Sequence, residues 1–216
     1  MLEEMSAFFE ARLAGYDTHM MTNIDSAGEF YPFTARCIPM DEGAKVLDLG
    51  CGTGLELHWI LDRNPTARVT GIDLSRGMLD ALREKFPRHD LTLICGSYFD
   101  VPFGEAIYDG AVSVESLHHF TAEEKLGLYR RLRAALKDGA SFILTDYFSL
   151  SDEEEALHRR ELLRLKAEEG ISDDRLFHYD TPLTVEHERQ TLLSAGFSRV
   201  EVLNRWGATY TLKAEK

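Results

Sequence analysis

A short apolar run that passes directly into three alternating glycines constrains this chain more than any other feature. The run contains an acid, Asp48, and the glycines Gly50, Gly52 and Gly54 follow before a helix-like segment begins. Glycine has no Cβ atom, so it adopts positive φ and lets a ligand lie against bare backbone, while the free N–H groups of the next helix face that ligand. The pattern therefore predicts a ligand loop at the carboxyl end of a buried strand.

The charge of Asp48 separates this loop from a dinucleotide site. A dinucleotide fingerprint has the spacing G-x-G-x-x-G, whereas the glycines here have the spacing G-x-G-x-G and follow an acid. A carboxylate favours a cationic or hydroxyl-rich group over a pyrophosphate. The alternative is a tight strand-to-helix turn that binds nothing, and the glycines alone leave it open.

A second acid lies at the end of the next strand-like run, residues 68–73. Asp73 follows the glycine loop at the distance where a β-α-β unit presents an acid to a ribose diol. Ser75 then has the character of a helix N-cap, and apolar residues follow it at helical spacing. Met78 lies in the first turn of this helix, where it would either join the core or cover an adenine ring.

Strand-like and helix-like segments alternate along the rest of the chain. They predict a doubly wound, mostly parallel α/β sheet that is covered on both faces. A capping box at Thr121 predicts a helix to about Leu136 that stops at Asp138-Gly139, and a second helix, whose leucines pack inward, runs from Ser151 to Gly170. The expected strands are 46–49, 68–73, 91–95, 108–114, 141–147, 199–203 and 208–213.

Several motifs together resemble the class I S-adenosylmethionine-dependent methyltransferases. VLDLGCGTGLEL and TGIDLSRGMLDALREKF are similar to the first two family motifs, and LTLICGSYFDVPF and YDGAVSVESLHHF to the third and fourth strands. LRAALKDGASFILTDYF resembles the helix, turn and fifth strand, and LLSAGFSRVEVLNRWGATYTLKAEK the closing helix and antiparallel hairpin. The resemblance covers roughly residues 45–216, and it implies a seven-stranded, Rossmann-like methyltransferase fold with an antiparallel C-terminal hairpin and helical lid additions.

The same resemblance implies one methyltransferase domain over residues 1–216. Its expected parts are a helical N-terminal cap (1–41), a cofactor-binding core (45–147), a helical insertion (148–184) and a closing helix with the hairpin (185–216). In this fold, additions such as the cap and the insertion usually cover the crevice above the strand ends and decide what is methylated.

The resemblance also implies that the loop binds S-adenosylmethionine, with S-adenosylhomocysteine as the product. The glycines would lie against the methionine part of the cofactor, Asp48 near its ammonium group and Asp73 on the ribose hydroxyls. The expected cofactor-binding residues are Asp48, Gly50, Cys51, Gly52, Gly54, Asp73, Leu74, Met78, Ser97, Tyr98 and Val114.

The adenine contact has three candidates. Many relatives carry Gly-Asp-Ala after the third strand, where this chain has Gly96-Ser97-Tyr98. Ser97 could donate a weaker hydrogen bond, Tyr98 could stack on the ring, or Asp100 could replace the missing carboxylate. The sequence leaves these alternatives open.

Methyl transfer from a sulfonium is an in-line displacement, so the protein supplies proximity, alignment and a route for the acceptor's proton. Histidine has the most suitable unperturbed pKa for the proton. The candidate catalytic residues are His119, which follows the fourth strand at the mouth of the crevice, and His19 and Tyr16 in the N-terminal cap. His and Asp residues lack a diagnostic ligand spacing, so no metal site is expected.

Charge and composition restrict the partner. The chain has 24 basic and 37 acidic residues and a net charge of −13, which repels a phosphate backbone, so nucleic acid is not an expected partner. No apolar stretch approaches a membrane span, and the three cysteines have no disulfide or metal spacing, so we expect free thiols and a cytoplasmic location. The expected acceptor is a small molecule of unidentified kind, and the oligomeric state cannot be predicted.

Two alternatives come from other functional classes. The chain could bind S-adenosylmethionine or S-adenosylhomocysteine as a regulatory protein without catalysis, because no unmistakable base is present. It could also be a nicotinamide-dependent oxidoreductase, although the glycine spacing, Asp48 and the expected terminal hairpin disfavour this alternative.

Overall fold

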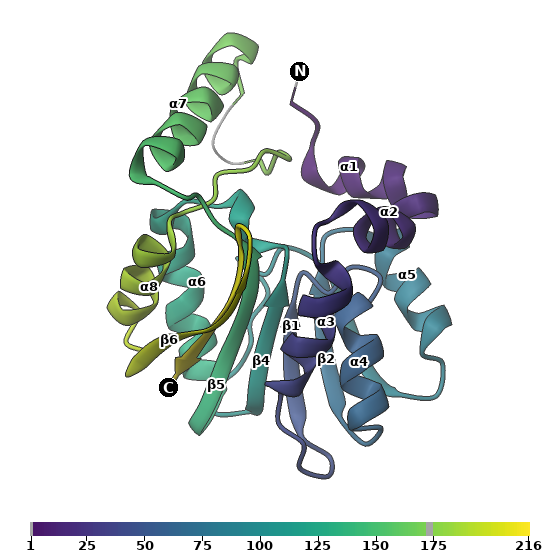
Figure 1. The fold of residues 1–216 in the computed structure, drawn as a ribbon. Coiled ribbons are helices and arrows are strands. Elements are labelled where there is room, and N and C mark those ends of the chain that lie inside the picture. Colours follow the sequence, from purple (N-terminus) through teal and green to yellow (C-terminus); the bar gives the residue numbers. More distant parts are fainter. Residues whose placement is uncertain (1, 172–174) are drawn as a thin grey trace.

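The computed structural model describes residues 2–171 and 175–216. Seven strands form one sheet in the order β3-β2-β1-β4-β5-β7-β6 (Figure 1). The first five strands are parallel to their neighbours, and β7 runs antiparallel to both β5 and β6. The strands are β1 Lys45–Leu49, β2 Arg68–Asp73, β3 Asp90–Cys95, β4 Tyr108–Val114, β5 Leu136–Tyr147, β6 Arg199–Trp206 and β7 Thr209–Glu215. The expected seven-stranded, Rossmann-like sheet with its antiparallel hairpin is confirmed.

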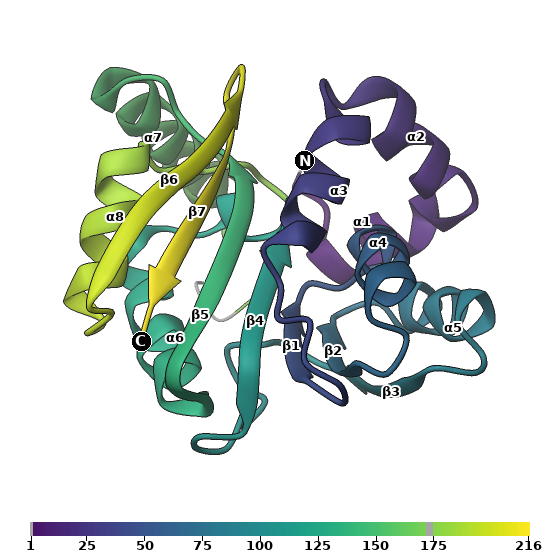
Figure 2. The ribbon, with the colours of Figure 1, turned by 60° about the horizontal axis from the view of Figure 1, so that its bottom comes forward.

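Alternate residues of the central strands pack against helices on opposite faces of the sheet, as the two-residue period of a strand requires. Leu47 and Leu49 belong to the core that includes α6 (Ala122–Ala135) and α8 (Val185–Ser194). Val46 belongs to the core on the other face, and the two layers are visible in Figure 2. That second face carries α3 (Ala27–Arg36), α4 (Leu55–Arg63) and α5 (Arg76–Lys85).

Strand β1 has β2 and β3 on one side and β4 and β5 on the other, so the direction in which successive strands are added reverses beside β1. In open α/β sheets such a switch point opens a crevice at the carboxyl ends of the strands, where ligands bind. Helices α1 (Met5–Arg12) and α2 (Tyr16–Asn23), joined by the turn Leu13–Gly15, lie over these ends (Figure 1). From here on, the name N-terminal cap is kept for α1, the turn and α2 alone, and no longer for the whole expected segment 1–41.

Two acids attach the N-terminal cap to the core. The carboxylate of Glu10 accepts hydrogen bonds from the Ser75 hydroxyl and from the backbone N–H of Gly77 at the start of α5. Asp17 accepts from Thr53 and forms an ion pair with Lys85. A carboxylate at a helix N-terminus is favourable, because it meets unpaired N–H groups and the positive end of the helix dipole.

Helix α7 (Asp152–Glu169) corrects one expectation. Its leucines were expected to pack inward, but it has no buried residue, and the exposed fractions of Leu157 and Leu163 are 57% and 58%. The helix projects beyond the sheet in Figure 1, and its other two leucines, Leu162 and Leu165, are only half-buried. Its N-terminus is instead capped by Ser151, and Gly170 ends it in the left-handed conformation, as the sequence predicts.

The junction after α6 also differs from the expectation. The helix ends at Ala135 and β5 begins at Leu136, so Asp138-Gly139 lies within the range of β5 and does not end the helix. Leu136 has an extended backbone, with φ −72° and ψ 146°, and pairs with Tyr108 of β4.

In the part of the chain that the structure describes, no helix combines the length and the apolar character that crossing a bilayer needs.

Candidate cofactor and acceptor site

The glycines between β1 and α4 serve different purposes. Gly50 has φ +75°, and a Cβ atom there would lie 2.0 Å from the Ser116 hydroxyl oxygen, so only glycine lets the loop after β4 approach. Gly54 has φ +77°, and its Cβ would lie 3.0 Å from a side-chain carbon of Leu82. Gly54 therefore serves the packing of α4 against α5 and does not line the cavity described below, so its expected contact with the cofactor stays a prediction.

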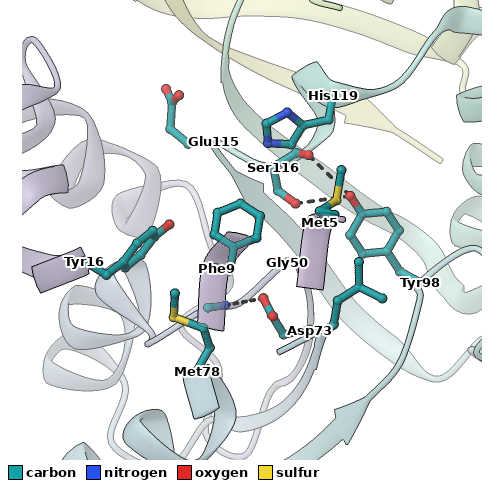
Figure 3. Close-up of a pocket in the computed structure, with 12 residues that line it drawn as sticks. Met5, Phe9, Tyr16, Gly50, Asp73, Met78, Tyr98, Glu115, Ser116 and His119 are labelled. Carbon is teal, nitrogen blue, oxygen red and sulfur yellow. Dashed lines mark hydrogen bonds between the residues drawn. The ribbon is translucent and has the colours of Figure 1, made fainter. Parts of the chain in front are cut away.

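A small cavity lies against this loop and brings many of the expected residues together. From the core it is lined by the expected Gly50, Gly52, Asp73, Leu74, Met78 and Tyr98, and by Glu115 and Ser116. The remaining lining residues are Met5, Phe9, Tyr16 and His119 (Figure 3). The N-terminal cap thus contributes part of the wall, including two residues, Met5 and Phe9, that are not among the expected site residues.

Asp73 has the geometry of a residue that orders the loop. One carboxylate oxygen accepts the backbone N–H of Gly52 at 2.9 Å, drawn in Figure 3, and the other accepts the N–H of Ser75 at 2.8 Å. A carboxylate oxygen can accept more than one hydrogen bond, so both oxygens of Asp73 remain able to accept from a ligand. Burial, partly offset by these backbone hydrogen bonds, raises the pKa of Asp73.

Four other expected residues do not line the cavity. The Cys51 thiol is buried, and its sulfur lies 2.7 Å from where a Cβ of Gly71 would be, which indicates packing between β1 and β2. Val114 lies in the core beneath α3 and α4. The Ser97 hydroxyl accepts the backbone N–H of Phe99 within its own turn. Asp48 is fully buried below the loop.

The positions of Ser97, Tyr98 and Asp100 distinguish the three candidates for the adenine contact. Tyr98 lines the cavity, and its hydroxyl lies 3.2 Å from the Ser116 hydroxyl and 3.3 Å from the Ser116 carbonyl oxygen. Asp100 is exposed and Ser97 is turned to its own loop. The geometry thus favours the ring of Tyr98 among the three candidates.

Asp48 and Glu56 form a buried pair of acids that the sequence analysis did not recognise. Apart from each other, the two carboxyl groups have no hydrogen-bond partner among the described residues at either oxygen of Asp48 or at Oε1 of Glu56. Burial and the neighbouring acid raise the pKa of Asp48 well above its usual range, and burial raises that of Glu56 to about 7. The two carboxyl groups therefore hold a proton at neutral pH. Glu56 lies in the first turn of α4, directly after the loop, but the sequence carries no signal that it meets Asp48.

This pair predicts a pH-dependent stability. Glu56 has a higher pKa in the folded chain, so between roughly pH 4.5 and 7 the folded state binds more protons than the unfolded state. Stability therefore falls as the pH rises through this window. Glu56→Gln removes the titration, and we expect it to stabilise the protein at pH 8 by on the order of 3 kcal/mol and to change little at pH 5.

Thermal melts at the two pH values test this prediction. The expected gain at pH 8 is several degrees for a chain of this length. The exposed Glu42→Gln is the matched control and should change neither melt. Equal pH dependence of Glu56→Gln and the unsubstituted chain would contradict the shared proton.

A larger cavity of about 950 Å³ adjoins the first one. Both cavities are lined by Phe9, Tyr16, Glu115 and His119, so they meet at these side chains. His19 lines only the larger cavity and is exposed. We call the larger cavity the acceptor chamber. The structure thus brings the expected Tyr16 and His119 to the junction of the two cavities, whereas the expected His19 lines the larger cavity alone.

One wall of the acceptor chamber carries a cluster of histidines and acids. The loop after β4 contributes His118 and His119, the end of β5 contributes Asp146, and Asp180 comes from the segment after α7. Nδ1 of His118 lies 2.6 Å from the Asp146 carboxylate, and Nδ1 of His119 lies 3.0 Å from that of Asp180. The sequence spacing indicates no metal site, yet the fold brings ligand atoms of His118, His119 and Asp180 within 4.8 Å of one another.

The charges in this cluster are unevenly distributed. Burial lowers the pKa of His118, but the charge of Asp146 and its hydrogen bond outweigh burial and raise the pKa to about 9. Burial and the neighbouring His118 charge lower the pKa of His119 to about 4. Burial also raises the pKa of Glu115, to about 8. His119 is thus neutral near pH 7, with a ring nitrogen able to accept a proton or to bind a cation.

Comparisons with known proteins agree with this geometry. Residues 46–139 match a family model described as a methyltransferase domain. The chain is 32% identical over 115 residues to an O-methyltransferase of Penicillium expansum, covering 50% of this chain and 40% of that protein. It is 31% identical over 146 residues to the cypemycin N-terminal methyltransferase of a Streptomyces species, covering 66% and 57%. The matched regions thus span 40% and 57% of the lengths of these two relatives.

Solved structures show the same fold. A Nostoc punctiforme protein superposes over 100% of this chain and 62% of its own, with a TM-score of 0.72 and 22% identity. Human N-acetylserotonin methyltransferase, solved in complex with S-adenosylmethionine, matches 88% of this chain and 52% of its own, with a TM-score of 0.64 and 16% identity. The match to the methyltransferase-domain model and to these relatives, together with the seven-stranded sheet, supports a class I S-adenosylmethionine-dependent methyltransferase family for this chain.

Proposed function

We propose that the chain transfers a methyl group from S-adenosylmethionine, bound at the glycine loop, to a small molecule in the acceptor chamber. The observation that carries this proposal is the junction between the two cavities at Phe9, Tyr16, Glu115 and His119. A donor on the loop and an acceptor in the chamber would meet there. Family membership supports S-adenosylmethionine as the donor.

The cofactor would be held by residues that already order the loop. Asp73 would accept hydrogen bonds from the ribose hydroxyls, and Tyr98 and Leu74 would border the adenine. Met78 and the backbone of Gly52 would line the remaining wall. Asp48, buried with Glu56, would act on the ammonium group only through the loop, because it does not reach the cavity.

The reaction needs alignment more than it needs a strong base. The carbon–sulfur bond to the methyl group breaks as the bond from the acceptor atom to that carbon forms, so S-adenosylhomocysteine leaves and the acceptor gives up a proton. Proximity and orientation supply most of such a rate enhancement. His119, which lines both cavities, would contact the acceptor, and Tyr16 would close the junction from the N-terminal cap.

The acceptor chamber supports a small molecule. Its volume of about 950 Å³ lies within the usual range of small-molecule sites. The net charge of −13 disfavours a polynucleotide. The relatives act on different atoms, as their names O-methyltransferase and N-terminal methyltransferase state, so they do not indicate the acceptor atom. A single domain and a cytoplasmic location stay predictions, which limited proteolysis and cell fractionation would test.

Transfer of a labelled methyl group to a panel of small hydroxyl, amine, thiol and carboxylate compounds tests the proposal. We expect one compound class to accept label and S-adenosylhomocysteine to appear in equal amount. His119→Ala should lower the transfer rate by about 100-fold or more with cofactor affinity retained, in the range for an acid–base or acceptor-orienting group. His58→Ala, on the exposed side of α4, is the matched control. Full activity of His119→Ala would contradict the role of His119.

A further inference from the structure

We propose that His118, His119 and Asp180 form a binding site for a divalent first-row transition metal in the wall of the acceptor chamber. Two histidines and one carboxylate are a recurrent ligand set for such ions, and the set leaves coordination positions open to a substrate. Metal binding itself does not depend on the proposed function. Only the use of the metal in methyl transfer rests on that function.

Two distances between the ligand atoms are close to those around one shared cation, and all three atoms lie within 4.8 Å of one another. Oδ1 of Asp180 lies 3.0 Å from Nδ1 of His119 and 3.6 Å from Nε2 of His118. Bonds of 2.0–2.2 Å from a metal to nitrogen or oxygen place neighbouring ligand atoms roughly 3.0–3.5 Å apart. The backbone supports the arrangement, because the N–H of Thr181 donates to the carbonyl oxygen of His118 and ties the segment of Asp180 to the loop after β4.

The ring of His118 is oriented as in known metal sites. Its Nδ1 lies 2.6 Å from Oδ1 of Asp146, which leaves Nε2 directed to Asp180, and a cation bound at Nε2 replaces the proton that this nitrogen carries in the absence of metal. In metal-bound histidines, the N–H of the second ring nitrogen commonly donates a hydrogen bond to a carboxylate, and this bond fixes both the tautomer and the ring orientation. Asp146 is itself held by the backbone N–H groups of Leu117 and His118, at 2.8 and 3.1 Å. Asp146 is therefore a positioning residue.

Two of the three ligand atoms are buried without a well-formed hydrogen bond. Nδ1 of His119 and Oδ1 of Asp180 face each other at 3.0 Å but lack hydrogen-bond geometry, and no other described group bonds to either atom. The His119 side chain is only 4% exposed, so water does not replace the missing partner freely. Buried polar atoms are normally satisfied. A cation between the two atoms would satisfy both at once.

The location of the site indicates what the metal would bind next. All three ligands line the acceptor chamber, and His119 also lines the cofactor cavity. A bound divalent cation lowers the pKa of a hydroxyl that coordinates to it. The acceptor would then be a small molecule that binds through an oxygen, which loses its proton to solvent and forms the new bond to the methyl carbon as the carbon–sulfur bond breaks.

Titration of tag-free, chelator-treated protein with Co²⁺ tests the site, because bound Co²⁺ absorbs visible light according to its ligands. We expect one Co²⁺ per chain, with binding at least 10-fold weaker in Asp180→Asn and in His119→Gln. Two independent variants keep the test decisive if one fails to fold by circular dichroism. His58→Ala, an exposed histidine outside the cluster, is the matched control and should bind as the unsubstituted chain does.

The outcomes separate the two proposals. Absent Co²⁺ binding, or equal binding in all variants, would overturn the metal site. A parallel titration of the metal-free protein with S-adenosylmethionine reports on the proposed function alone. Cofactor binding without Co²⁺ binding therefore refutes only the metal, whereas Co²⁺ binding that fails in both variants supports the metal even where no cofactor binds.

Discussion

Replacing Asp73 by asparagine should weaken S-adenosylmethionine binding by about 100-fold. The carboxylate accepts the N–H groups of Gly52 and Ser75 and would accept the ribose hydroxyls as well. Asparagine has one acceptor oxygen in place of two and carries no charge. Hydrogen bonds to a charged group contribute roughly 1.5–3 kcal/mol each, and a loss of about 2.7 kcal/mol corresponds to 100-fold in affinity.

Calorimetry on the variant and a matched control measures this effect. Asp90→Asn removes an exposed carboxylate at the start of β3, which pairs only loosely with Arg68 at 3.6 Å. We expect Asp90→Asn to bind the cofactor like the unsubstituted chain. Unchanged affinity in a folded Asp73→Asn would show that the ribose does not lie on Asp73.

Substituting Gly50 by alanine should have the second large effect. The new Cβ would overlap the Ser116 side chain at 2.0 Å, and φ +75° is unfavourable for alanine. Overpacking and backbone strain each cost about 1–3 kcal/mol. We therefore expect a loss of about 2–4 kcal/mol in unfolding free energy and, because the loop must move, loss of measurable cofactor binding.

A second glycine separates strain from overlap. Gly43 has φ +69°, but a Cβ there would meet nothing within 4 Å. Gly43→Ala should therefore cost only the backbone term and keep the cofactor site. Adding Ser116→Gly to Gly50→Ala removes the overlapping side chain and should restore part of the stability, a coupling that a double-mutant cycle measures. No difference between the two alanine variants would refute the close approach at Gly50.

The parts of the fold that were predictable from sequence carry local signals. The apolar run, the glycines and Asp73 mark β1, the loop and the end of β2 through spacing alone, and these residues meet at one edge of the sheet because parallel strands share that edge. The exposure of Leu157 and Leu163 to solvent was not predictable from such local signals. Apolar residues at helical spacing indicate a helix, but only the tertiary structure decides whether a surface faces it.

The chemistry of the site divides along the same line. The positions of Gly50 and Asp73 beside one cavity were predictable, because both follow the ends of neighbouring parallel strands. The pairing of Asp48 with Glu56, and the approach of Asp180 to His118 and His119, were not. Each depends on how separate segments pack, and no periodicity or motif in the sequence records it.

The most direct test of the central claim is calorimetric titration of the purified chain with S-adenosylmethionine, S-adenosylhomocysteine and NADH. We expect both adenosyl-sulfur ligands to bind with one site per chain and NADH not to bind. Saturating S-adenosylhomocysteine at about a hundred times its dissociation constant should add roughly 2.7 kcal/mol to the unfolding free energy, which a thermal melt detects. Binding of NADH alone would contradict the account and favour a nicotinamide-dependent oxidoreductase.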